Sequence, residues 1–180
     1  MILLLDGSLG APDGNTSRLA QQLSDCLRPA MDVRHHTLRE SLPSESLLRE
    51  AKAFVFVTGT YWDSWGSPLQ RFLEDSTRFE GSDLWLGKPA AILVTMHSVG
   101  GKEILSRLQG VLSSLGLLIP PMSGMVYSLA NHLALRAGGD EDFWRPDDLK
   151  IIAHNLLVAT GHRKGWRRWP VEHDFQKIWI

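Results

Sequence analysis

The apolar positions of the chain fall into short runs that predict buried strands. Met1 to Asp6, Ala53 to Thr58 and Lys88 to Met96 are nearly continuous apolar stretches, the pattern of strands covered on both faces. Met31 to Leu38 predicts a weaker, more polar strand at an edge of the sheet. A fifth strand region spans residues 117–127, with two prolines in its middle.

Between these runs the apolar residues recur at helical spacing. The spacing predicts a helix over about residues 15–28, a short turn over 44–51, a helix from 67, a strongly amphipathic helix over 104–115 and a last helix from 146. Ser67 is the predicted N-cap of the third of these, and Gln70 completes a capping-box spacing with it. Gly116 suits the C-terminal cap of the fourth, and residues 130–145 predict a loop with a single helical turn.

Strand and helix alternate five times along the chain. This alternation predicts a doubly wound α/β domain, in which a parallel sheet is covered by helices on both faces. Ligands of such sheets bind at the carboxyl ends of the strands, where the strand order switches direction. Three loops that contain glycine follow strands in this sequence, so we expect them to meet at that edge.

The first of these loops joins the first strand to the first helix and is rich in glycine and hydroxyl residues. Backbone N–H groups and the positive end of a helix dipole converge in such a loop. Ser8, Asn15, Thr16 and Ser17 add side-chain donors. No Lys or Arg precedes Arg18, and the glycines do not follow the spacing of a dinucleotide-binding turn. The pattern therefore predicts a site for one phosphate monoester and not for a triphosphate with magnesium.

The second loop carries aromatic residues directly after a predicted central strand. Tyr61, Trp62 and Trp65 lie here, and aromatic side chains at a ligand-binding edge indicate a flat ligand that stacks on them. Two other interpretations stay open. The aromatic side chains could simply cover the edge of the sheet, and Trp65 fits a contact with a second subunit equally well.

The third loop, His97 to Gly101, follows the next strand and offers polar groups for the edge of a planar heterocycle. One phosphate, one flat ring and polar contacts along the edge of that ring together describe flavin mononucleotide (FMN).

The chain resembles the flavodoxin-like NAD(P)H-dependent FMN reductase family over about residues 1–128. Gly7-Ser8 together with Gly14-Asn15-Thr16 is similar to the family's phosphate loop. Residues 58–64 and 67–75 resemble its flavin-ring loop and the helix that follows, and residues 87–91 and 95–101 resemble its fourth strand and third ring-contacting loop. The family often carries Arg in the first loop, where this chain has Leu9-Gly10-Ala11, and Pro at the position of Gly59.

The resemblance implies a flavodoxin-like, doubly wound, five-stranded parallel sheet that binds FMN non-covalently in a homodimer. NADPH or NADH is then the co-substrate, and a small molecule such as a flavin or quinone is the electron acceptor. The implied phosphate ligands are Ser8, Asn15, Thr16 and Ser17. The implied ring pocket is shaped by Thr60, Tyr61, Trp62, Asp63 and Ser64. The pyrimidine edge lies by His97, Ser98, Gly100 and Gly101, which stabilise the negative charge of reduced flavin. No side chain is implied as a general acid or base.

Two other functions stay open. One is a flavodoxin-like electron carrier that binds FMN but uses no nicotinamide, although the chain lacks the high acidic charge that favours docking to basic redox partners. The other is a binding or interaction module without enzymatic activity. Nicotinamide oxidation separates the first two functions, and flavin binding separates both from the third.

The composition fits one domain in a reducing compartment. A chain of 180 residues can bury a sizeable core, and its net charge of -1 predicts no general attraction to nucleic acid or to anionic membranes. The single cysteine, Cys26, cannot form an internal disulfide and is predicted to be a buried thiol. No targeting segment, no metal-ligand spacing and no apolar run of the roughly 18 residues needed to span a membrane is evident. We therefore expect a cytoplasmic protein.

The C-terminal stretch differs from the rest of the chain. We expect residues 1–164 to form the FMN-binding domain and residues 165–180 to be a Trp-rich extension that packs on the domain or on a partner subunit. The stretch contains Trp166, Trp169, Phe175 and Trp179, and between or before them Arg163, Lys164, Arg167 and Arg168. Basic residues with interleaved aromatics can bind single-stranded nucleic acid, but the chain as a whole is not basic, which favours packing. A further possibility is that the basic residues meet the extra phosphate of NADPH.

Overall fold

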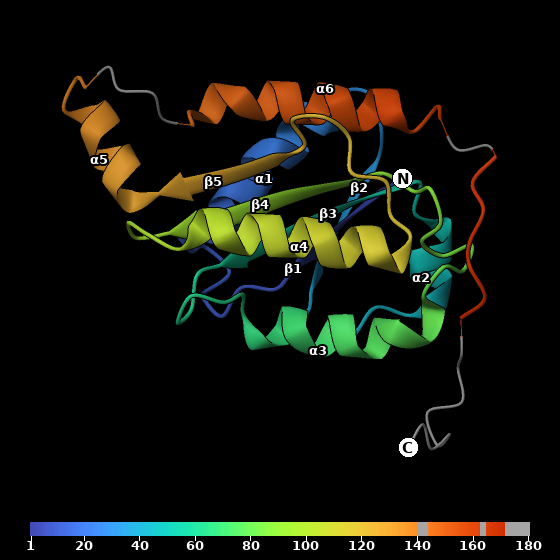
Figure 1. Cartoon of the computed structure of the whole chain (residues 1–180). Helices are drawn as coiled ribbons and strands as arrows, with labels where there is room; N and C mark the ends of the chain where they lie inside the picture. Colours follow the sequence, from blue (N-terminus) through green and yellow to red (C-terminus); the bar gives the residue numbers. More distant parts are fainter. Residues whose placement is uncertain (140–143, 163–164, 172–180) are drawn as a thin grey trace.

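The computed structural model contains one sheet of five parallel strands (Figure 1). The strands are β1 (Ile2–Asp6), β2 (Val33–Thr37), β3 (Ala53–Gly59), β4 (Ala90–Met96) and β5 (Gly124–Ser128). They lie in the order β2-β1-β3-β4-β5, the flavodoxin-like order of a doubly wound sheet, so the predicted fold class is confirmed. The structure describes residues 1–139, 144–162 and 165–171.

Helices cover both faces of this sheet (Figure 1). One face is covered by α1 (Asn15–Leu27) and α6 (Leu149–Ala159), and the other by α2 (Glu45–Glu50), α3 (Ser67–Ser76) and α4 (Gly101–Leu115). A further helix, α5 (Leu129–Arg136), follows β5 and projects beyond the carboxyl ends of the strands (Figure 1). Among the described residues, no helix has both the length and the apolar composition that crossing a membrane requires.

The two layers of the core explain why the strands are apolar at nearly every position. Successive residues of a strand point to opposite faces. In β1, Leu3 and Leu5 pack in the cluster beneath α3 and α4, whereas Ile2 and Leu4 pack in the cluster beneath α1 and α6. All four side chains are fully buried. The polar strand β2 lies at one edge of the sheet, as predicted.

Three local predictions are wrong. The N-cap of α3 is Gly66 and not Ser67, and Gln70 accepts a hydrogen bond from Nε1 of Trp65 at 2.7 Å. Residues 129–136 form the helix α5, where the sequence predicts a loop with one turn; Oγ of Ser128 caps it by accepting a hydrogen bond from N of Asn131 at 2.9 Å. Cys26 is only partly buried, at the margin of the α1–α6 cluster.

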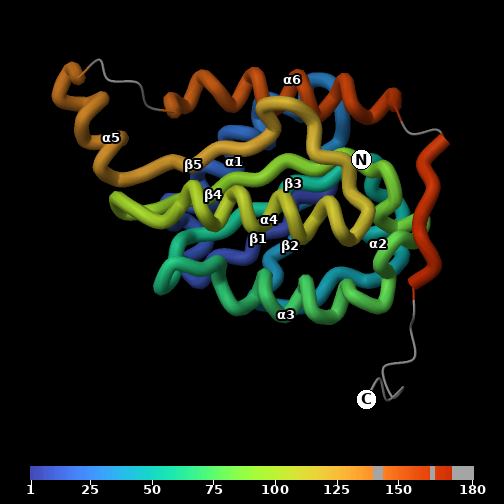
Figure 2. The backbone as a smooth tube through the Cα atoms, viewed as in Figure 1, coloured from blue at the N-terminus to red at the C-terminus, as the bar shows by residue number. Residues whose placement is uncertain are grey.

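The described part of the C-terminal stretch, residues 165–171, runs along the edge of the domain where the amino ends of the strands lie (Figure 2). Trp166 lies so close to Gly87 that a Cβ atom added there would be 2.3 Å from its Cδ1. Arg168 lies 3.3 Å from the corresponding position at Gly81. These contacts are made within one chain. Other residues of the predicted extension, Arg163, Lys164, Phe175 and Trp179, lie outside the described residues.

Candidate functional site

The loops that follow β1, β3 and β4 contact one another at the carboxyl ends of the strands, as the sequence predicts. N of Leu9 donates a hydrogen bond to Oη of Tyr61 at 2.8 Å, which joins the first loop to the second. Oγ1 of Thr60 donates to O of Thr95 at 3.0 Å, which joins the second loop to β4. Three segments that are far apart in the sequence therefore form one continuous surface.

Glycine permits the closest of these contacts. A Cβ atom on Gly66 would lie 2.3 Å from the carbonyl oxygen of Gly7, closer than any side chain tolerates. Gly7 itself lies against α3, because a Cβ atom there would be 2.5 Å from Cβ of Leu69. The two backbones thus touch directly where the first and second loops begin.

The N-terminus of α1 is open toward the first loop. Its N-cap is Gly14, no side chain of the described residues caps it, and its first turn contains no acidic residue. The first N–H groups of a helix have no partner within the helix, and together with the dipole they favour an anion. This end of α1 thus has the features of a phosphate site.

Asp6 orders the first loop from within. Its carboxylate accepts hydrogen bonds from N of Ser8 at 2.9 Å and from Oγ of Ser17 at 2.8 Å. Of the four predicted phosphate donors, Ser17 therefore uses its hydroxyl proton on Asp6, whereas Ser8 uses only its backbone N–H. Both residues border a separate hollow on the β2 side of the loop. The other two, Asn15 and Thr16, face the main pocket.

Arg39, from the segment between β2 and α2, holds the tip of the first loop, and sequence reasoning did not identify it. Its Nη1 donates hydrogen bonds to the carbonyl oxygens of Leu9 and Gly10. The guanidinium of Arg39 therefore lies at the Leu9-Gly10-Ala11 segment, where members of the FMN reductase family often carry an Arg. No local pattern could have revealed the contact, because about 30 residues separate the partners.

The second loop is a tight reverse turn in a strained conformation. Tyr61 and Ser64 exchange two backbone hydrogen bonds of 2.8 and 3.0 Å. Trp62 and Asp63, at the tip, have φ angles of 49° and 55°, in the left-handed region that non-glycine residues avoid. The Trp62 side chain is fully exposed. A strained turn that presents a large apolar ring to solvent is typical of a ligand contact.

The other two aromatic residues of this loop are tied to the chain itself. The ring of Tyr61 lies against Gly59 and Gly66, with its hydroxyl on the first loop, so that it forms the rim of the pocket. Trp65 is stacked on the guanidinium of Arg107, whose Cζ is 4.8 Å from the ring centroid. Trp65 is therefore anchored within this chain, and of the three aromatic side chains only that of Trp62 stands free.

The third loop closes against the second. Gly100 is the N-cap of α4 with φ of 86°, and a Cβ atom there would lie 2.6 Å from Oδ1 of Asp63. Glycine is needed at this position both for the backbone angle and for the close contact. Sδ of Met96 accepts a hydrogen bond from N of Gly101 at 3.3 Å. His97 and Ser98 are exposed at the tip of the loop.

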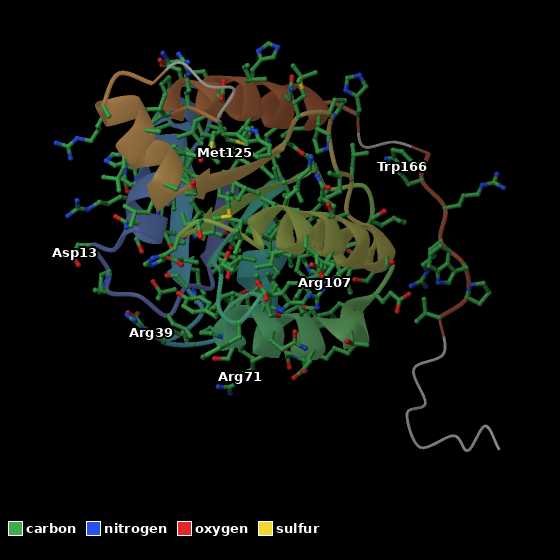
Figure 3. The ribbon with its side chains drawn as sticks, turned by 60° about the vertical axis from the view of Figure 1, so that its left-hand side comes forward. Asp13, Arg39, Arg71, Arg107, Met125 and Trp166 are labelled. Carbon is green, nitrogen blue, oxygen red and sulfur yellow. The ribbon has the colours of Figure 1, made fainter. Side chains whose placement is uncertain are left out.

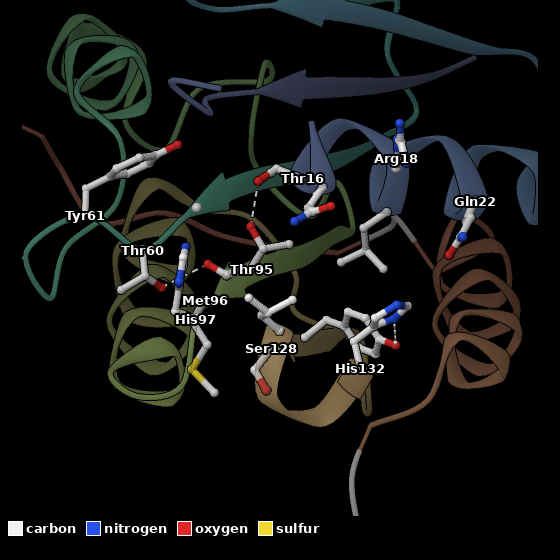
Figure 4. Close-up of a pocket in the computed structure, with 15 residues that line it drawn as sticks. Thr16, Arg18, Gln22, Thr60, Tyr61, Thr95, Met96, His97, Ser128 and His132 are labelled. Atoms are coloured by element: carbon white, nitrogen blue, oxygen red, sulfur yellow. Dashed lines mark hydrogen bonds between the residues drawn. The ribbon is translucent and has the colours of Figure 1, made fainter. Parts of the chain in front are cut away.

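A cavity of about 450 Å³ lies between α1, the ends of β3, β4 and β5, and α5 (Figure 4). The predicted residues that line it are Asn15, Thr16, Thr60, Tyr61 and His97. Those that lie outside its lining are Ser8, Ser17, Trp62, Asp63, Ser64, Ser98, Gly100 and Gly101. Lining residues that sequence reasoning did not select include Thr95, Tyr127, Ser128 and His132.

Hydrogen bonds connect the walls of this cavity. The hydroxyls of Thr16 on α1 and Thr95 on β4 lie 2.6 Å apart (Figure 4). Side chains of the described residues that line the cavity include Arg18 and two histidines but no carboxylate. A cavity of this size, lined mainly by polar side chains and by no carboxylate of the described residues, suits a cofactor with an anionic group.

The strand order and the pocket at the carboxyl edge define a flavodoxin-like α/β protein with a cofactor-sized site. The chain belongs to the NADPH-dependent FMN reductase family, whose model matches residues 1–131. This membership supports an FMN-dependent oxidoreductase. A comparison with curated proteins gave no significant match.

Solved structures with low sequence identity share the fold. An oxidoreductase from Corynebacterium diphtheriae has a TM-score of 0.68 and 16% identity, covering 89% of this chain and 97% of its own. A flavodoxin of Streptococcus pneumoniae TIGR4 has a TM-score of 0.65 and 19% identity, covering 88% and 99%. RosB, solved with bound 8-demethyl-8-formylriboflavin-5'-phosphate, has a TM-score of 0.62 and 16% identity, covering 89% and 79%.

Proposed function

We propose that this protein is an FMN-dependent oxidoreductase that takes hydride from NADPH or NADH and passes the electrons to a small acceptor such as a flavin or quinone. The observation that carries the proposal is a cavity of about 450 Å³ at the carboxyl edge of the sheet, lined by the first turns of α1 and by residues of the second and third loops. Membership of the FMN reductase family supports the cofactor and the nicotinamide substrate. The ligand of RosB is also a flavin 5'-phosphate.

The phosphate of FMN would lie at the first turn of α1. Asn15 and Thr16 line the cavity there, and the N–H groups of the turn point toward the first loop. The backbone N–H of Ser8 and the hydroxyl of Ser17 bond the carboxylate of Asp6, which would fix the loop around the phosphate and leave the hydroxyl of Ser8 as a phosphate donor. Arg39 brings positive charge to the tip of the same loop.

The flavin ring would lie between the second and third loops. Thr60 and Tyr61 form one wall, with Trp62, Asp63 and Ser64 at the outer end of the same loop. His97 forms the opposite wall, followed by Ser98, Gly100 and Gly101. When bound, FMN supplies the hydride chemistry, while the protein binds the ring, orients it and stabilises its charge.

An absorbance spectrum tests this function directly. The purified protein is incubated with FMN, freed of excess flavin, and then mixed anaerobically with NADPH or NADH. We expect a bound-flavin spectrum that at least one nucleotide bleaches. Retained flavin that neither nucleotide reduces would contradict the oxidoreductase and identify an electron carrier. No retained flavin would contradict the cofactor itself, provided that FMN also leaves the thermal melting temperature unchanged.

Three further features of the protein belong to the same proposal. Residues 1–164 form the FMN-binding domain and residues 165–180 an extension, the protein is a homodimer, and it works in the cytoplasm. Arg167 and Arg168, the basic residues of the extension that the structure describes, lie at the amino ends of the strands, opposite the cavity, so these two side chains would not meet NADPH bound at the cavity of the same chain. Sedimentation of the full chain checks the dimer.

A further inference from the structure

The wall of the cavity farthest from the first loop carries two side chains that the proposed flavin contacts do not use. Tyr127 is the penultimate residue of β5, and His132 lies in the first turns of α5. Oη of Tyr127 and Nδ1 of His132 lie 3.2 Å apart, and the two rings meet edge to face (Figure 4). Both residues line the cavity and both are partly buried.

The fold fixes the position of this pair. Tyr127 lies beside Thr95 in the register of β4 and β5, and parallel neighbours point to the same face of the sheet. Ser128 ends the strand and caps α5, so that the chain turns sharply and brings His132 back over Tyr127. The side chains of Thr16, Thr95, Tyr127 and His132 therefore form a polar row from α1 to α5 across the cavity.

The hydrogen bond of the pair can run in either direction. A neutral imidazole with a bare Nδ1 accepts the phenol proton, whereas an imidazole protonated at Nδ1 donates to the phenol oxygen. In the second arrangement the O–H of Tyr127 is free to donate to a ligand in the cavity. Burial raises the pKa of Tyr127 above its ordinary value of 10.0, so the phenol keeps its proton at neutral pH.

We propose that Tyr127 and His132 are the proton-donating pair for the electron acceptor, and that this pair adapts the site to acceptors with a carbonyl oxygen, such as quinones. The inference rests on the proposed function, because the electrons come from FMN reduced by NAD(P)H. Tyr127 is the group that touches the acceptor, and His132 is a positioning residue that acts through it.

The chemistry balances for a quinone. Its reduction to a hydroquinone consumes one hydride, delivered from the reduced cofactor, and one further proton. The carbonyl π bond breaks, and the oxygen takes its proton from the hydroxyl of Tyr127 to become C–OH. The phenol oxygen is reprotonated from Nδ1 of His132, which regains its proton from solvent. An acceptor that takes single electrons and no proton, such as ferricyanide, does not need a proton from Tyr127 and His132.

The test compares these two acceptors on the same flavin-loaded protein. The full chain, its Tyr127→Phe variant and its His132→Gln variant are loaded with FMN and reduced anaerobically. Each is then mixed with 1,4-benzoquinone or with ferricyanide, and reoxidation is followed by stopped flow in H₂O and D₂O. His154→Gln is the matched control, because His154 is an exposed residue of α6 outside the cavity.

We expect Tyr127→Phe to slow reoxidation by quinone roughly 100-fold, the usual contribution of a general acid, and to leave the ferricyanide rate unchanged. His132→Gln should slow the quinone reaction less, and His154→Gln should have no effect. The wild type should show a solvent isotope effect with quinone only, and Tyr127→Phe should lose it. Equal changes with both acceptors, or a quinone rate that neither variant alters, would overturn the proposal.

The experiment separates this inference from the proposed function. If NADPH and NADH fail to reduce the bound flavin, dithionite is used to reduce it, and the reoxidation rates still decide the role of the pair. Wild-type protein that binds no FMN would overturn both. Thermal melting of each variant shows whether it is folded, and a misfolded Tyr127→Phe protein leaves His132→Gln and the isotope effect of the wild type to decide the outcome.

Discussion

The two ends of the sheet differ in how their aromatic side chains are placed. At the amino ends of the strands, Trp85 is fully buried against Phe54 and Phe72, and Trp166 lies over Gly87. At the carboxyl ends, Trp62 is fully exposed on a strained turn beside a polar cavity. In Figure 3, Arg39 of the candidate site and Trp166 of the amino end lie on opposite sides of the molecule. Bulky apolar residues cover the first end, which keeps a smaller hollow of about 360 Å³ beside Trp166, whereas the second end keeps polar groups accessible around the larger cavity.

Two helix ends show the same contrast. The C-terminus of α2 is closed by the buried Lys88, whose Nζ donates hydrogen bonds to the carbonyl oxygens of Leu48 at 3.0 Å and Arg49 at 3.1 Å. A cation at this end of a helix satisfies the last carbonyls and complements the dipole. The N-terminus of α1 receives no side-chain cap from the described residues. The uncapped N-terminus of α1 faces the candidate site, whereas the capped C-terminus of α2 belongs to the scaffold.

We expect the largest effect on stability from removing a buried aromatic side chain at the amino ends of the strands. Trp85→Ala removes a fully buried indole from the cluster around Phe54 and Phe72, so we expect the free energy of unfolding to fall by about 3–5 kcal/mol. Urea unfolding followed by circular dichroism measures it. The FMN affinity of the folded fraction should stay the same. A loss of less than about 1 kcal/mol would contradict the buried packing of this residue.

A second substitution tests the positive charge of Arg39 beside the first loop. Arg39→Ala removes the guanidinium that holds the carbonyls of Leu9 and Gly10, so we expect FMN to bind about tenfold more weakly, as for a lost hydrogen bond to a charged group. Arg71→Ala is the matched control, because Arg71 is exposed on α3 (Figure 3). Flavin fluorescence quenching gives both dissociation constants. Equal affinities of the two variants would rule out a role for Arg39 in the phosphate site.

The strained turn gives a third prediction. Trp62→Ala and Trp62→Gly both remove the exposed ring, so both should weaken FMN binding by roughly 1 kcal/mol of stacking energy. Only glycine relieves the φ of 49°, so the glycine variant should be more stable than the alanine variant by about 1 kcal/mol. Thermal and urea unfolding measure the difference. If the alanine variant were the more stable, the turn would not be strained as described.

The smallest effect concerns pH. Burial raises the pKa of Tyr127 above 10.0, so the folded state holds this proton more tightly than the unfolded chain does. The associated stability is present below pH 10.0 and is lost as the pH rises through the folded pKa, because the unfolded chain then releases the proton first. Titration of tyrosinate absorbance should show one late step that Tyr127→Phe removes. A single step at the ordinary value would contradict the burial of this phenol.

The sequence predicts the order of strands and helices because the pattern of apolar positions reflects which residues are buried. Strands β1, β3 and β4 are apolar at nearly every position because both faces of the sheet are covered. Helix α5 escaped prediction for the opposite reason, since none of its residues is buried and the helix is only 8 residues long. The cap of α3 was misplaced by one residue because Gly66 fits the backbone geometry that a hydroxyl residue usually provides.

For the candidate site, the sequence predicts which loops contribute to it but not which side chains face the cavity. Thr60 directly follows β3, and Asn15 and Thr16 begin the helix after the loop that follows β1, so these segments could be assigned to the carboxyl edge from the sequence. The direction of a side chain could not, as Tyr61 shows by bonding the first loop. Arg39 reaches the site through a tertiary contact that leaves no local signal in the sequence. Tyr127 and His132 are only five residues apart, but their contact depends on the turn from β5 into α5, a helix that the sequence did not predict.

The central claim is that the phosphate of FMN binds at the first turn of α1. The most direct test is a fluorescence titration of wild-type protein, Asn15→Ala and Trp166→Ala with FMN and with riboflavin, which lacks the phosphate. We expect wild-type protein and Trp166→Ala to bind FMN at least about tenfold more tightly than riboflavin, a difference of roughly 1.4 kcal/mol, and Asn15→Ala to lose much of this preference. Equal binding of the two flavins by wild-type protein, or a preference that Asn15→Ala leaves intact while Trp166→Ala abolishes it, would contradict the account.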